Sequence, residues 1–251
     1  MPDILYEKKD HIAVVTMNRP EKLNAYDIPM LRELEQTWYK FRDDDDAWVA
    51  IFTGAGRAFC AGHGLDSLEE LGTLVEPPSI HYGTLDIFKP IIAAVNGHAL
   101  GGGCSMVMGS DLAVAAENAT FGYPQPAYGL TSLGGHQWLP RMVSAKVAAE
   151  IMLTGERYSA EQFYKMGLIN KVVPLDQLMP EAFKMAERLT KNGPIALYAT
   201  KENLIRGMRT IYLPDGVRFS QLNYIRVWNT EDRAEGLKAF QEKRPPQWKA
   251  K

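Results

Sequence analysis

Four short runs of β-branched and other apolar residues constrain the fold of this chain more than any other feature. Runs of this length and composition are typical of buried strands. They span residues 12–17, 48–53, 91–95 and 112–115. Because helical stretches separate most of these strands, the pattern predicts an α/β fold.

The segment between the first two runs predicts an amphipathic helix. Its apolar residues recur at intervals of three and four, which places one apolar stripe against the sheet. The stripe consists of Ile28, Leu31, Leu34, Trp38 and Phe41. The acidic run 43–46 follows, and we expect a solvated turn there, because consecutive carboxylates cannot all converge on one cation.

Beyond Thr120 the pattern changes to helices. Four apolar residues keep a helical spacing, namely Leu178, Ala182, Met185 and Leu189. Two further helices are expected to begin near Pro194 and Glu231. A chain of 251 residues fits one large α/β domain with an appended part. We therefore expect a core at residues 1–174 and a helical C-terminal subdomain at residues 175–251.

The charge of the chain argues against nucleic acids and membranes as principal partners. The formal net charge is −2 and the isoelectric point is about 6.2, so no broad positive field attracts phosphate backbones or anionic lipids. The first residues lack a basic segment followed by an apolar one, and no apolar run approaches membrane-spanning length. We therefore expect a cytoplasmic protein.

Cys60 and Cys104 are the two cysteines of the chain, and each is flanked by small or apolar residues. This setting favours reduced core thiols over a disulfide framework. A zinc site usually needs about four ligands, so the pair predicts no metal site.

Residues 53–59, Thr-Gly-Ala-Gly-Arg-Ala-Phe, follow a predicted strand and invite comparison with a dinucleotide-binding fingerprint. Phe59 replaces the third glycine of that fingerprint, and no helix-opening pattern follows. We therefore expect no nicotinamide or flavin cofactor.

A run of three glycines, Gly101 to Gly103, opens a predicted helix directly after a strand and a turn. Glycine lets the backbone approach another group closely, and the first amides of a helix lack partners within it. The run serves either tight packing of the helix on the strand or the presentation of amides to a ligand. A second segment, residues 57–63, also leaves a strand through small residues, which favours a ligand site.

Residues 57–63 and 94–104 together resemble the two signatures of the crotonase superfamily, the enoyl-CoA hydratases and isomerases. Further segments in the same order are similar to this family, namely residues 18–25, 120–122, 145–155, 167–173 and 232–244. The resemblance implies an α/β spiral of repeated β-β-α units with a helical C-terminal region that mediates trimer contacts. It also implies a homotrimer or a dimer of trimers.

The resemblance assigns an oxyanion hole to two backbone amides, those of His63 and Gly102. A thioester carbonyl that becomes an enolate develops negative charge on oxygen, and one preorganised donor there contributes about 3–4 kcal/mol. The expected ligand is therefore an acyl-CoA, with coenzyme A as part of the thioester substrate and no separate cofactor. We expect this site in the core, residues 1–174.

By the same resemblance, seven residues contact coenzyme A. Three belong to the turn around its nucleotide, two line the adenine pocket, and two approach from a neighbouring subunit. In that order they are Lys22, Leu23 and Ala25, then Ala61 and Leu65, then Phe240 and Lys243. Without the resemblance, the two lysines would be interpreted as solvated charges, and Leu23, Leu65 and Phe240 as core residues.

Two residues depart from the family pattern. Typical hydratases place one glutamate after the glycine run and another after the following Phe-Gly, where this chain has Ser105 and Gln125. A hydroxyl and an amide can orient water but do not titrate usefully, whereas hydration needs a base and an acid. His63 and His136 are candidate substitutes. Other titratable candidates are Tyr82, Asp86, Tyr123 and Tyr128.

The leading interpretation is an enzyme of the enoyl-CoA hydratase type, with Ser105 and Gln125 positioning water or substrate. The first alternative is a decarboxylase or C–C bond hydrolase of the same superfamily, because either reaction also proceeds through a thioester enolate. The second is a non-catalytic acyl-CoA-binding protein that lost turnover with the two carboxylates. Their loss also removes repulsion against a negatively charged acyl group, so a dicarboxylic thioester fits such a site.

Residues 71–82 are the expected acyl-pocket loop, and their composition predicts neither the length nor the shape of the acyl group.

Overall fold

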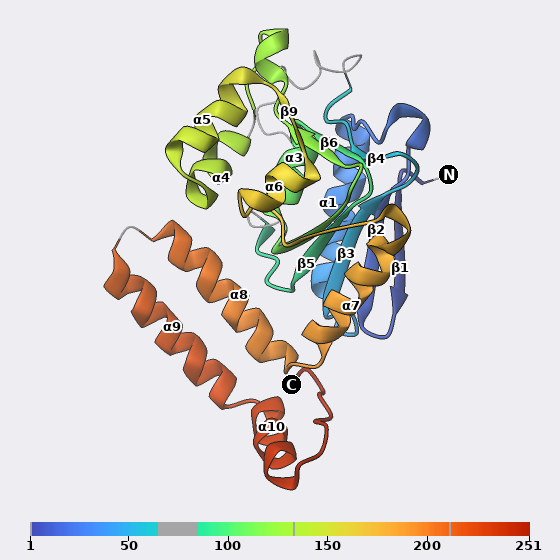
Figure 1. Cartoon of the computed structure of the whole chain (residues 1–251). Helices are drawn as coiled ribbons and strands as arrows, with labels where there is room; N and C mark the ends of the chain where they lie inside the picture. The colour runs from blue at the N-terminus through green and yellow to red at the C-terminus, as the bar shows by residue number, and fades with distance from the viewer. Residues whose placement is uncertain (1, 65–84, 133, 211) are drawn as a thin grey trace.

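The computed structural model describes residues 2–64, 85–132, 134–210 and 212–251, and their strands form two sheets (Figure 1). The larger sheet has the order β1-β2-β3-β5-β7-β10. Its strands are parallel except for the antiparallel pair β1 and β2. They are β1 (Ile4–Lys9), β2 (Ile12–Met17), β3 (Val49–Gly54), β5 (Ile91–Val95), β7 (Leu112–Ala116) and β10 (Lys171–Val173).

The smaller sheet is made of short strands that follow the long ones. β4 (Ala58–Cys60) follows β3, β6 (His98–Leu100) follows β5, and β8 (Thr120–Gly122) follows β7. These three strands pair in parallel, and β9 (Arg157–Ser159) pairs antiparallel with β8. The chain therefore winds as the predicted spiral, in which each successive turn adds one strand to each sheet (Figure 1).

The long strands lie where the sequence predicts them, and the short ones do not show in its pattern. The bounds of β2 and β5 match the prediction, and those of β3 and β7 differ by one residue. The sequence does not predict β1, whose charged second half resembles a loop. The predicted change to helices after Thr120 is incomplete, because three short strands, β8, β9 and β10, also lie there. Strands of three residues are too short to display a period.

α1 (Ile28–Asp43) packs its predicted apolar stripe into the core beside the larger sheet. The Asp27 side chain caps the helix by accepting a hydrogen bond from the amide of Met30 at 3.0 Å. The acidic run 43–46 ends the helix and forms a turn, as predicted. Its Asp44 lies 3.1 Å from Lys8 Nζ and accepts a 3.1 Å hydrogen bond from the Tyr6 hydroxyl. The run therefore anchors the edge strand β1.

Three shorter helices follow β8 in the chain. α4 (Gly135–Met142) packs against α3 (Gly102–Gly109), and α5 (Ala145–Thr154) packs against α4. α6 (Ala160–Lys165) packs on β8 and β9. Together these helices lie on one side of α3, the helix that the glycine run opens (Figure 1).

α7 (Leu178–Thr190) packs on the face of the larger sheet opposite α1. Successive side chains of a strand point to opposite faces, and the core divides accordingly. On β3, Phe52 packs in the cluster of α1, whereas Ile51 packs with Leu178, Ala182 and Ala186 of α7. The domain boundary between residues 174 and 175 remains a prediction, although α7, on its C-terminal side, completes the packing of the sheet.

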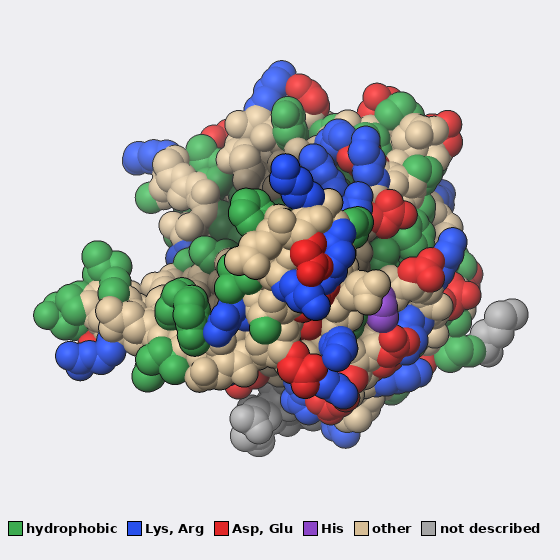
Figure 2. All heavy atoms as spheres, turned by 90° about the horizontal axis from the view of Figure 1, so that it is seen from below, with side chains coloured by type: hydrophobic (Ala, Val, Ile, Leu, Met, Phe, Trp, Pro, Cys, Tyr) green, Lys and Arg blue, Asp and Glu red, His purple; other side chains and the backbone are tan. Residues whose placement is uncertain are grey.

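The remaining helices extend away from the sheets. α8 (Pro194–Arg209) and α9 (Leu213–Trp228) lie side by side, and α10 (Glu231–Glu242) follows (Figure 1). The sequence pattern does not separate α9 from its neighbours. Hydrophobic side chains gather on the projecting end of this hairpin (Figure 2). The exposed ones on α9 are Leu213, Val217, Leu222, Tyr224, Ile225 and Trp228. No helix among the described residues combines the length and apolar character needed to cross a bilayer.

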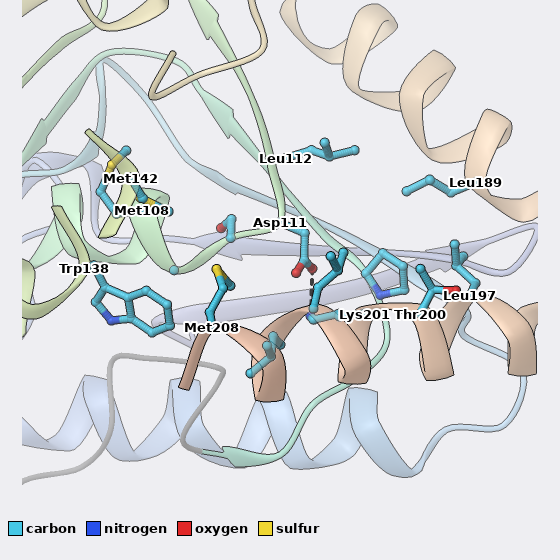
Figure 3. Close-up of a pocket in the computed structure, with 15 residues that line it drawn as sticks. Met108, Asp111, Leu112, Trp138, Met142, Leu189, Leu197, Thr200, Lys201 and Met208 are labelled. Atoms are coloured by element: carbon cyan, nitrogen blue, oxygen red, sulfur yellow. Dashed lines mark ion pairs between the residues drawn. The ribbon is translucent and has the colours of Figure 1, made fainter. Parts of the chain in front are cut away.

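An ion pair between the buried Lys201 and the partly exposed Asp111 ties α8 to the larger sheet (Figure 3). Lys201 Nζ lies 2.7 Å from Asp111 Oδ2 and donates a second hydrogen bond, of 2.8 Å, to the carbonyl oxygen of Lys89. The Lys201 side chain is 8% exposed; burial lowers the pKa of its ammonium group, and Asp111 opposes that shift. The pair borders a cavity of about 320 Å³ lined mainly by apolar side chains of α4 and α8.

Replacing Asp111 with alanine is expected to lower the free energy of unfolding by about 3 kcal/mol, because the Lys201 ammonium is left buried without its carboxylate. The change also removes the acceptor of the Ile91 amide, at 2.7 Å. Urea unfolding at a fixed protein concentration measures the loss. The control Glu161→Ala removes an exposed ion pair with Lys165 and is expected to change the free energy by less than about 0.5 kcal/mol. Equal effects of the two substitutions would contradict the prediction.

Candidate active site

Two backbone segments cross at the start of α3. One is β4 with the residues that follow it, and the other is the glycine run after β6. A Cβ atom at Gly103 would overlap the Cys60 carbonyl oxygen. One at Gly62 would lie 3.0 Å from the Leu100 carbonyl oxygen and 3.7 Å from the amide nitrogen of Gly102. The two main chains therefore touch with no side chain between them, which only glycine permits.

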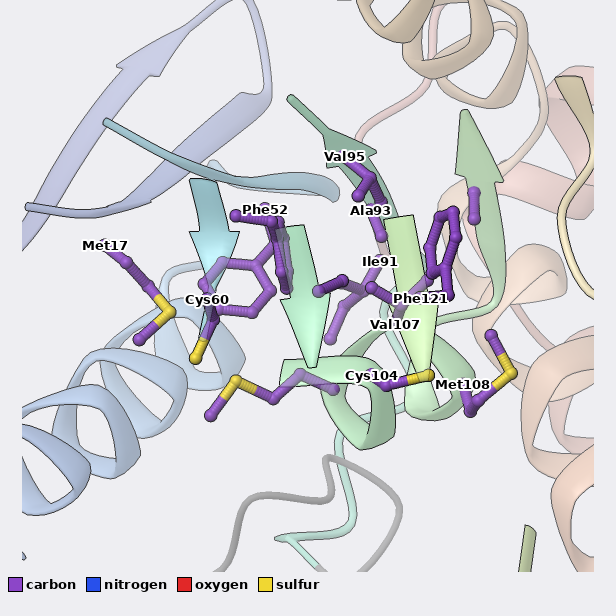
Figure 4. Close-up of a cluster of buried hydrophobic side chains, with 14 of the residues drawn as sticks. Met17, Phe52, Cys60, Ile91, Ala93, Val95, Cys104, Val107, Met108 and Phe121 are labelled. Atoms are coloured by element: carbon purple, nitrogen blue, oxygen red, sulfur yellow. The ribbon is translucent and has the colours of Figure 1, made fainter. Parts of the chain in front are cut away.

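The hydrophobic core beneath α3 holds the crossing in place (Figure 4). Cys104 and Val107 of α3 pack in one cluster with Phe121 of β8 and the inner residues of the larger sheet. The amide of Gly101 donates a 2.8 Å hydrogen bond to the carbonyl oxygen of Gly122, which fixes the loop before the helix.

The two cysteines belong to this core. Cys60 and Cys104 are completely buried and are not joined by a disulfide. Burial raises the pKa of each thiol to about 12, so both stay protonated at neutral pH. The predicted core location of both cysteines is confirmed.

The amides of His63 and Gly102 lie at the crossing. Tyr26 and His63 form a parallel bridge in which the Tyr26 amide donates to Gly62 O at 2.9 Å and the Gly64 amide donates to Tyr26 O at 2.8 Å. In this pattern the amide of His63 points away from Tyr26. Gly102 is the first residue of α3, so its amide has no acceptor within the helix. Within the described ranges neither amide has an acceptor, which leaves both available to a ligand.

Tyr26 joins the two segments that carry these amides. Its ring is buried and meets the His63 imidazole edge to face, with ring centres 5.3 Å apart. Its hydroxyl lies so close to Gly102 that a Cβ atom there would overlap it. Burial raises the pKa of Tyr26, so the phenol is neutral. The sequence places Tyr26 directly after the predicted coenzyme A turn, but an aromatic residue there is equally typical of core, and its role is not predictable from that signal.

Ser105 lies one turn into α3 and is completely buried. Its amide donates to the Gly101 carbonyl oxygen at 3.0 Å, and its hydroxyl donates to the Tyr123 hydroxyl at 3.3 Å. Burial raises the pKa of Tyr123 well above its usual range. Ser105 and Tyr123 therefore form a neutral polar pair behind the glycine run.

Gln125 brings its amide against the glycine run. It opens a short 3₁₀-helix, Gln125–Tyr128, and its Nε2 lies 3.1 Å from the position that a Cβ atom at Gly101 would take. Its Oε1 is buried, and no described residue donates a hydrogen bond to it. Gln125 therefore carries an unused acceptor at the N-terminal end of α3.

The His63 imidazole also carries an unused acceptor. Its Nδ1 lies 2.9 Å from the Gly64 carbonyl oxygen. A carbonyl can only accept, so this contact assigns the proton to Nδ1 and leaves a lone pair on Nε2. That Nε2 is buried and has no partner in the described part of the chain.

Four of the residues predicted to contact coenzyme A lie on two adjacent chain segments beside His63. The Ala61 amide donates to the Leu23 carbonyl oxygen at 3.1 Å, so the turn of Lys22, Leu23 and Ala25 runs alongside Ala61. Lys22 is exposed at the end of a 3₁₀-helix, Pro20–Lys22. The two segments lead directly to the amide of His63.

Asn24 fixes this turn. Its side chain is completely buried, and its backbone is left-handed, with φ 56°. Its Nδ2 donates to the carbonyl oxygens of Ala55 and Ala58 at 2.9 and 2.8 Å, and its Oδ1 accepts from the Arg19 amide at 2.9 Å. One side chain therefore ties the turn to β4.

The structure does not bring the other predicted site residues to the crossing. His136 is exposed on α4 and makes no hydrogen bond to a described residue. Phe240 is 84% exposed on α10, and Lys243 is exposed at the end of that helix. Leu65 and the loop 71–82 lie outside the described residues. Of the other titratable candidates, Asp86 and Tyr128 are exposed, and Tyr82 lies outside the described residues.

Comparison with known protein families agrees with the geometry. The model of the enoyl-CoA hydratase/isomerase family matches residues 7–251. The chain belongs to this family. The predicted membership of the crotonase superfamily is therefore confirmed.

Relatives within the enoyl-CoA hydratase/isomerase family are similar along nearly the whole chain. A probable mitochondrial enoyl-CoA hydratase of Dictyostelium discoideum is 37% identical over 251 residues, which cover 96% of this chain and 89% of that protein. An (E)-benzylidenesuccinyl-CoA hydratase of Thauera aromatica is 36% identical over 250 residues, which cover 97% of each.

Solved structures of the family confirm the fold. An enoyl-CoA hydratase of Mycobacterium tuberculosis H37Rv superimposes with a TM-score of 0.93 at 32% identity, over 100% of both chains. A probable enoyl-CoA hydratase/isomerase of Mycobacterium abscessus gives the same TM-score at 35% identity, also over 100% of both.

Proposed function

We propose that this protein is an acyl-CoA lyase of the enoyl-CoA hydratase type, which adds water to the double bond of an enoyl thioester. The observation that carries the proposal is the pair of backbone amides of His63 and Gly102, which lie on two touching segments and have no acceptor among the described residues. Addition to the β-carbon moves negative charge onto the thioester oxygen, where each preorganised donor contributes about 3–4 kcal/mol. The amide of Gly102 also opens a helix, whose N-terminal end favours negative charge.

The turn beside His63 is the proposed site of the coenzyme A part of the substrate. Lys22, Leu23, Ala25 and Ala61 lie on two adjacent chain segments that lead to the proposed oxyanion amides. Coenzyme A is proposed to enter only as part of the substrate, with no separate cofactor. The exposed Phe240 and Lys243 are proposed to reach the nucleotide end of a substrate bound to a neighbouring copy, in a homotrimer or a dimer of trimers.

The acyl group of the substrate is proposed to carry a second carboxylate. Ser105 and Gln125 stand where typical hydratases have glutamates. Without those two carboxylates, the described site repels a negatively charged acyl group less strongly than the site of a typical hydratase does. The Thauera aromatica relative supports this, since the succinyl group in its name carries such a carboxylate. Ser105 and Gln125 are proposed to position water or substrate, and the exposed His136 has no described contact through which to assist them.

Hydration of a panel of enoyl-CoA esters tests the proposal. We expect the protein to add one water to at least one ester, and to prefer a dicarboxylic enoyl-CoA over crotonyl-CoA in kcat/KM. The ultraviolet absorbance of the conjugated thioester and the product mass report the reaction. Calorimetry with a saturated acyl-CoA establishes independently that the site is occupied. Binding of that ester without hydration of any enoyl-CoA would contradict the proposal and favour a binding protein.

A decarboxylase is the second candidate, because uncharged Ser105 and Gln125 also suit a malonyl-type thioester whose loss of carbon dioxide leaves the same enolate. Release of carbon dioxide from such an ester, at a higher kcat/KM than any hydration, would favour it. A ring-opened product would instead indicate C–C bond hydrolysis.

A further inference from the structure

We propose that the His63 imidazole transfers the proton in hydration, and that Gln125 helps to hold the water. This inference rests on the proposed function. Hydration needs a group that accepts a proton from water and returns one to carbon. Ser105 and Gln125 cannot do so at neutral pH, and the Tyr123 phenol remains protonated because burial raises its pKa. Among the residues that the structure describes at the crossing, His63 is therefore the ionisable group suited to this transfer.

The position of the imidazole is fixed by the protein itself. The Nδ1–H of His63 donates to the Gly64 carbonyl oxygen at 2.9 Å, and the Tyr26 ring lies edge-on to the imidazole at an interplanar angle of 84°. These contacts hold the tautomer in which Nε2 carries the lone pair. A buried acceptor without a donor is unfavourable, so a lone pair held in this way is suited to a donor supplied by the reaction.

Gln125 Oε1 is a second buried acceptor without a described donor. Gln125 packs its amide against Gly101, and a Cβ atom at Gly62, the residue before His63, would lie 3.7 Å from the Gly102 amide nitrogen. The Gln125 side chain and the main chain just before His63 therefore both lie against the peptide between Gly101 and Gly102. A water molecule has two O–H groups, and we assign one to His63 Nε2 and the other to Gln125 Oε1.

The step balances without any further reactant. His63 Nε2 removes a proton from the water as its oxygen bonds to the β-carbon of the enoyl group. The electron pair of the double bond moves toward the thioester, whose oxygen becomes an enolate held by the amides of His63 and Gly102. The imidazolium then returns the proton to the α-carbon, and the enolate collapses to the thioester. The product has gained one water, and the imidazole is restored.

Substitution of the His63 side chain tests the inference, because the proposed oxyanion donor is the backbone amide and remains in place. In His63→Gln we expect kcat for the best enoyl-CoA to fall about 10²–10⁴-fold. The Kd for the saturated acyl-CoA, measured by calorimetry, is expected to stay unchanged within error. The control is His11→Gln, which removes a half-exposed imidazole stacked on Trp48 at the far edge of the larger sheet and is expected to leave kcat unchanged.

Chemical rescue separates proton transfer from a structural role. Added imidazole is expected to restore part of kcat in His63→Ala, and methylimidazoles to do so in the order of their basicity. If His63→Ala fails to fold, the split between kcat and Kd in His63→Gln decides the question alone. Hydration by the wild-type protein together with full kcat in His63→Gln would overturn this inference but not the proposed function. Absence of wild-type hydration would overturn both.

Discussion

Gly102→Ala is expected to lower kcat/KM for hydration by about 10²–10³-fold. A Cβ atom at this position would overlap the Tyr26 hydroxyl, so either the phenol or the peptide must move. Movement of the peptide displaces the amide that opens α3, and movement of Tyr26 disturbs the ring that meets the His63 imidazole. Steady-state kinetics with the best enoyl-CoA measure the loss, and calorimetry with a saturated acyl-CoA shows whether binding survives.

The matched control for this substitution is Gly207→Ala in α8. No heavy atom lies within 4 Å of a Cβ atom at Gly207, and alanine favours a helix over glycine by about 1 kcal/mol. We therefore expect full activity and a small gain in stability. Shortening the obstructing side chain, by Tyr26→Leu in the Gly102→Ala background, is expected to recover part of the activity. Full activity in Gly102→Ala alone would show that the amide of Gly102 is not an oxyanion donor.

Asn24→Ala is expected to lower the free energy of unfolding by about 4 kcal/mol. The buried side chain makes three hydrogen bonds, and its loss leaves the Ala55 carbonyl and the Arg19 amide without these partners, while the Ala58 carbonyl keeps only its 3.1 Å hydrogen bond from Asn96 Nδ2 among the side chains. Alanine also adopts the left-handed backbone of this position less readily than asparagine, at a cost of about 1 kcal/mol. Because Asn24 lies inside the proposed coenzyme A turn, the Kd for acyl-CoA is expected to rise as well. Urea unfolding and calorimetry measure the two effects.

Two further variants separate the causes of the Asn24 effect. Asn24→Gly restores the backbone freedom without the hydrogen bonds, so it is expected to differ from Asn24→Ala by about 1 kcal/mol. Asn229→Ala removes an exposed hydrogen bond to the Ile225 carbonyl oxygen and is expected to change the free energy by less than about 0.5 kcal/mol. If Asn24→Ala were as mild as Asn229→Ala, Asn24 would not tie the turn to β4.

The sequence predicts those helices and strands whose apolar pattern extends over enough residues to be recognised. The strands β2 and β5 are apolar runs of five or six residues, the helix α1 repeats its apolar residues at intervals of three and four, and their predicted places are confirmed. The strands of the smaller sheet have three residues each and display no period. β1 escapes prediction for another reason, since half of its residues face solvent at the sheet edge.

In the candidate active site, features within one sequence motif are predictable, whereas contacts between residues far apart in the chain are not. The glycine run and the residues before His63 are each a continuous motif in the sequence. Their meeting at an acyl-CoA site could therefore be proposed from the two motifs. The contact of Tyr26 with Gly102 joins residues far apart in the chain, and neither segment contains a pattern that predicts it. The tautomer of His63 depends on one carbonyl oxygen, that of Gly64, whose direction is set only by the folded backbone.

The three glycines at the start of α3 also differ in how they can change during evolution. Gly102 faces the Tyr26 side chain, so a prior substitution of Tyr26 opens room for a larger residue. Gly101 has φ 55°, a left-handed backbone that strains any side chain even where a neighbour leaves space. Gly103 faces the Cys60 carbonyl oxygen, which every residue at position 60 would carry. Lineages of this protein can therefore explore position 102 by an ordered pair of mutations. Position 101 stays closed because of its backbone conformation, and position 103 stays closed for as long as the two main chains cross.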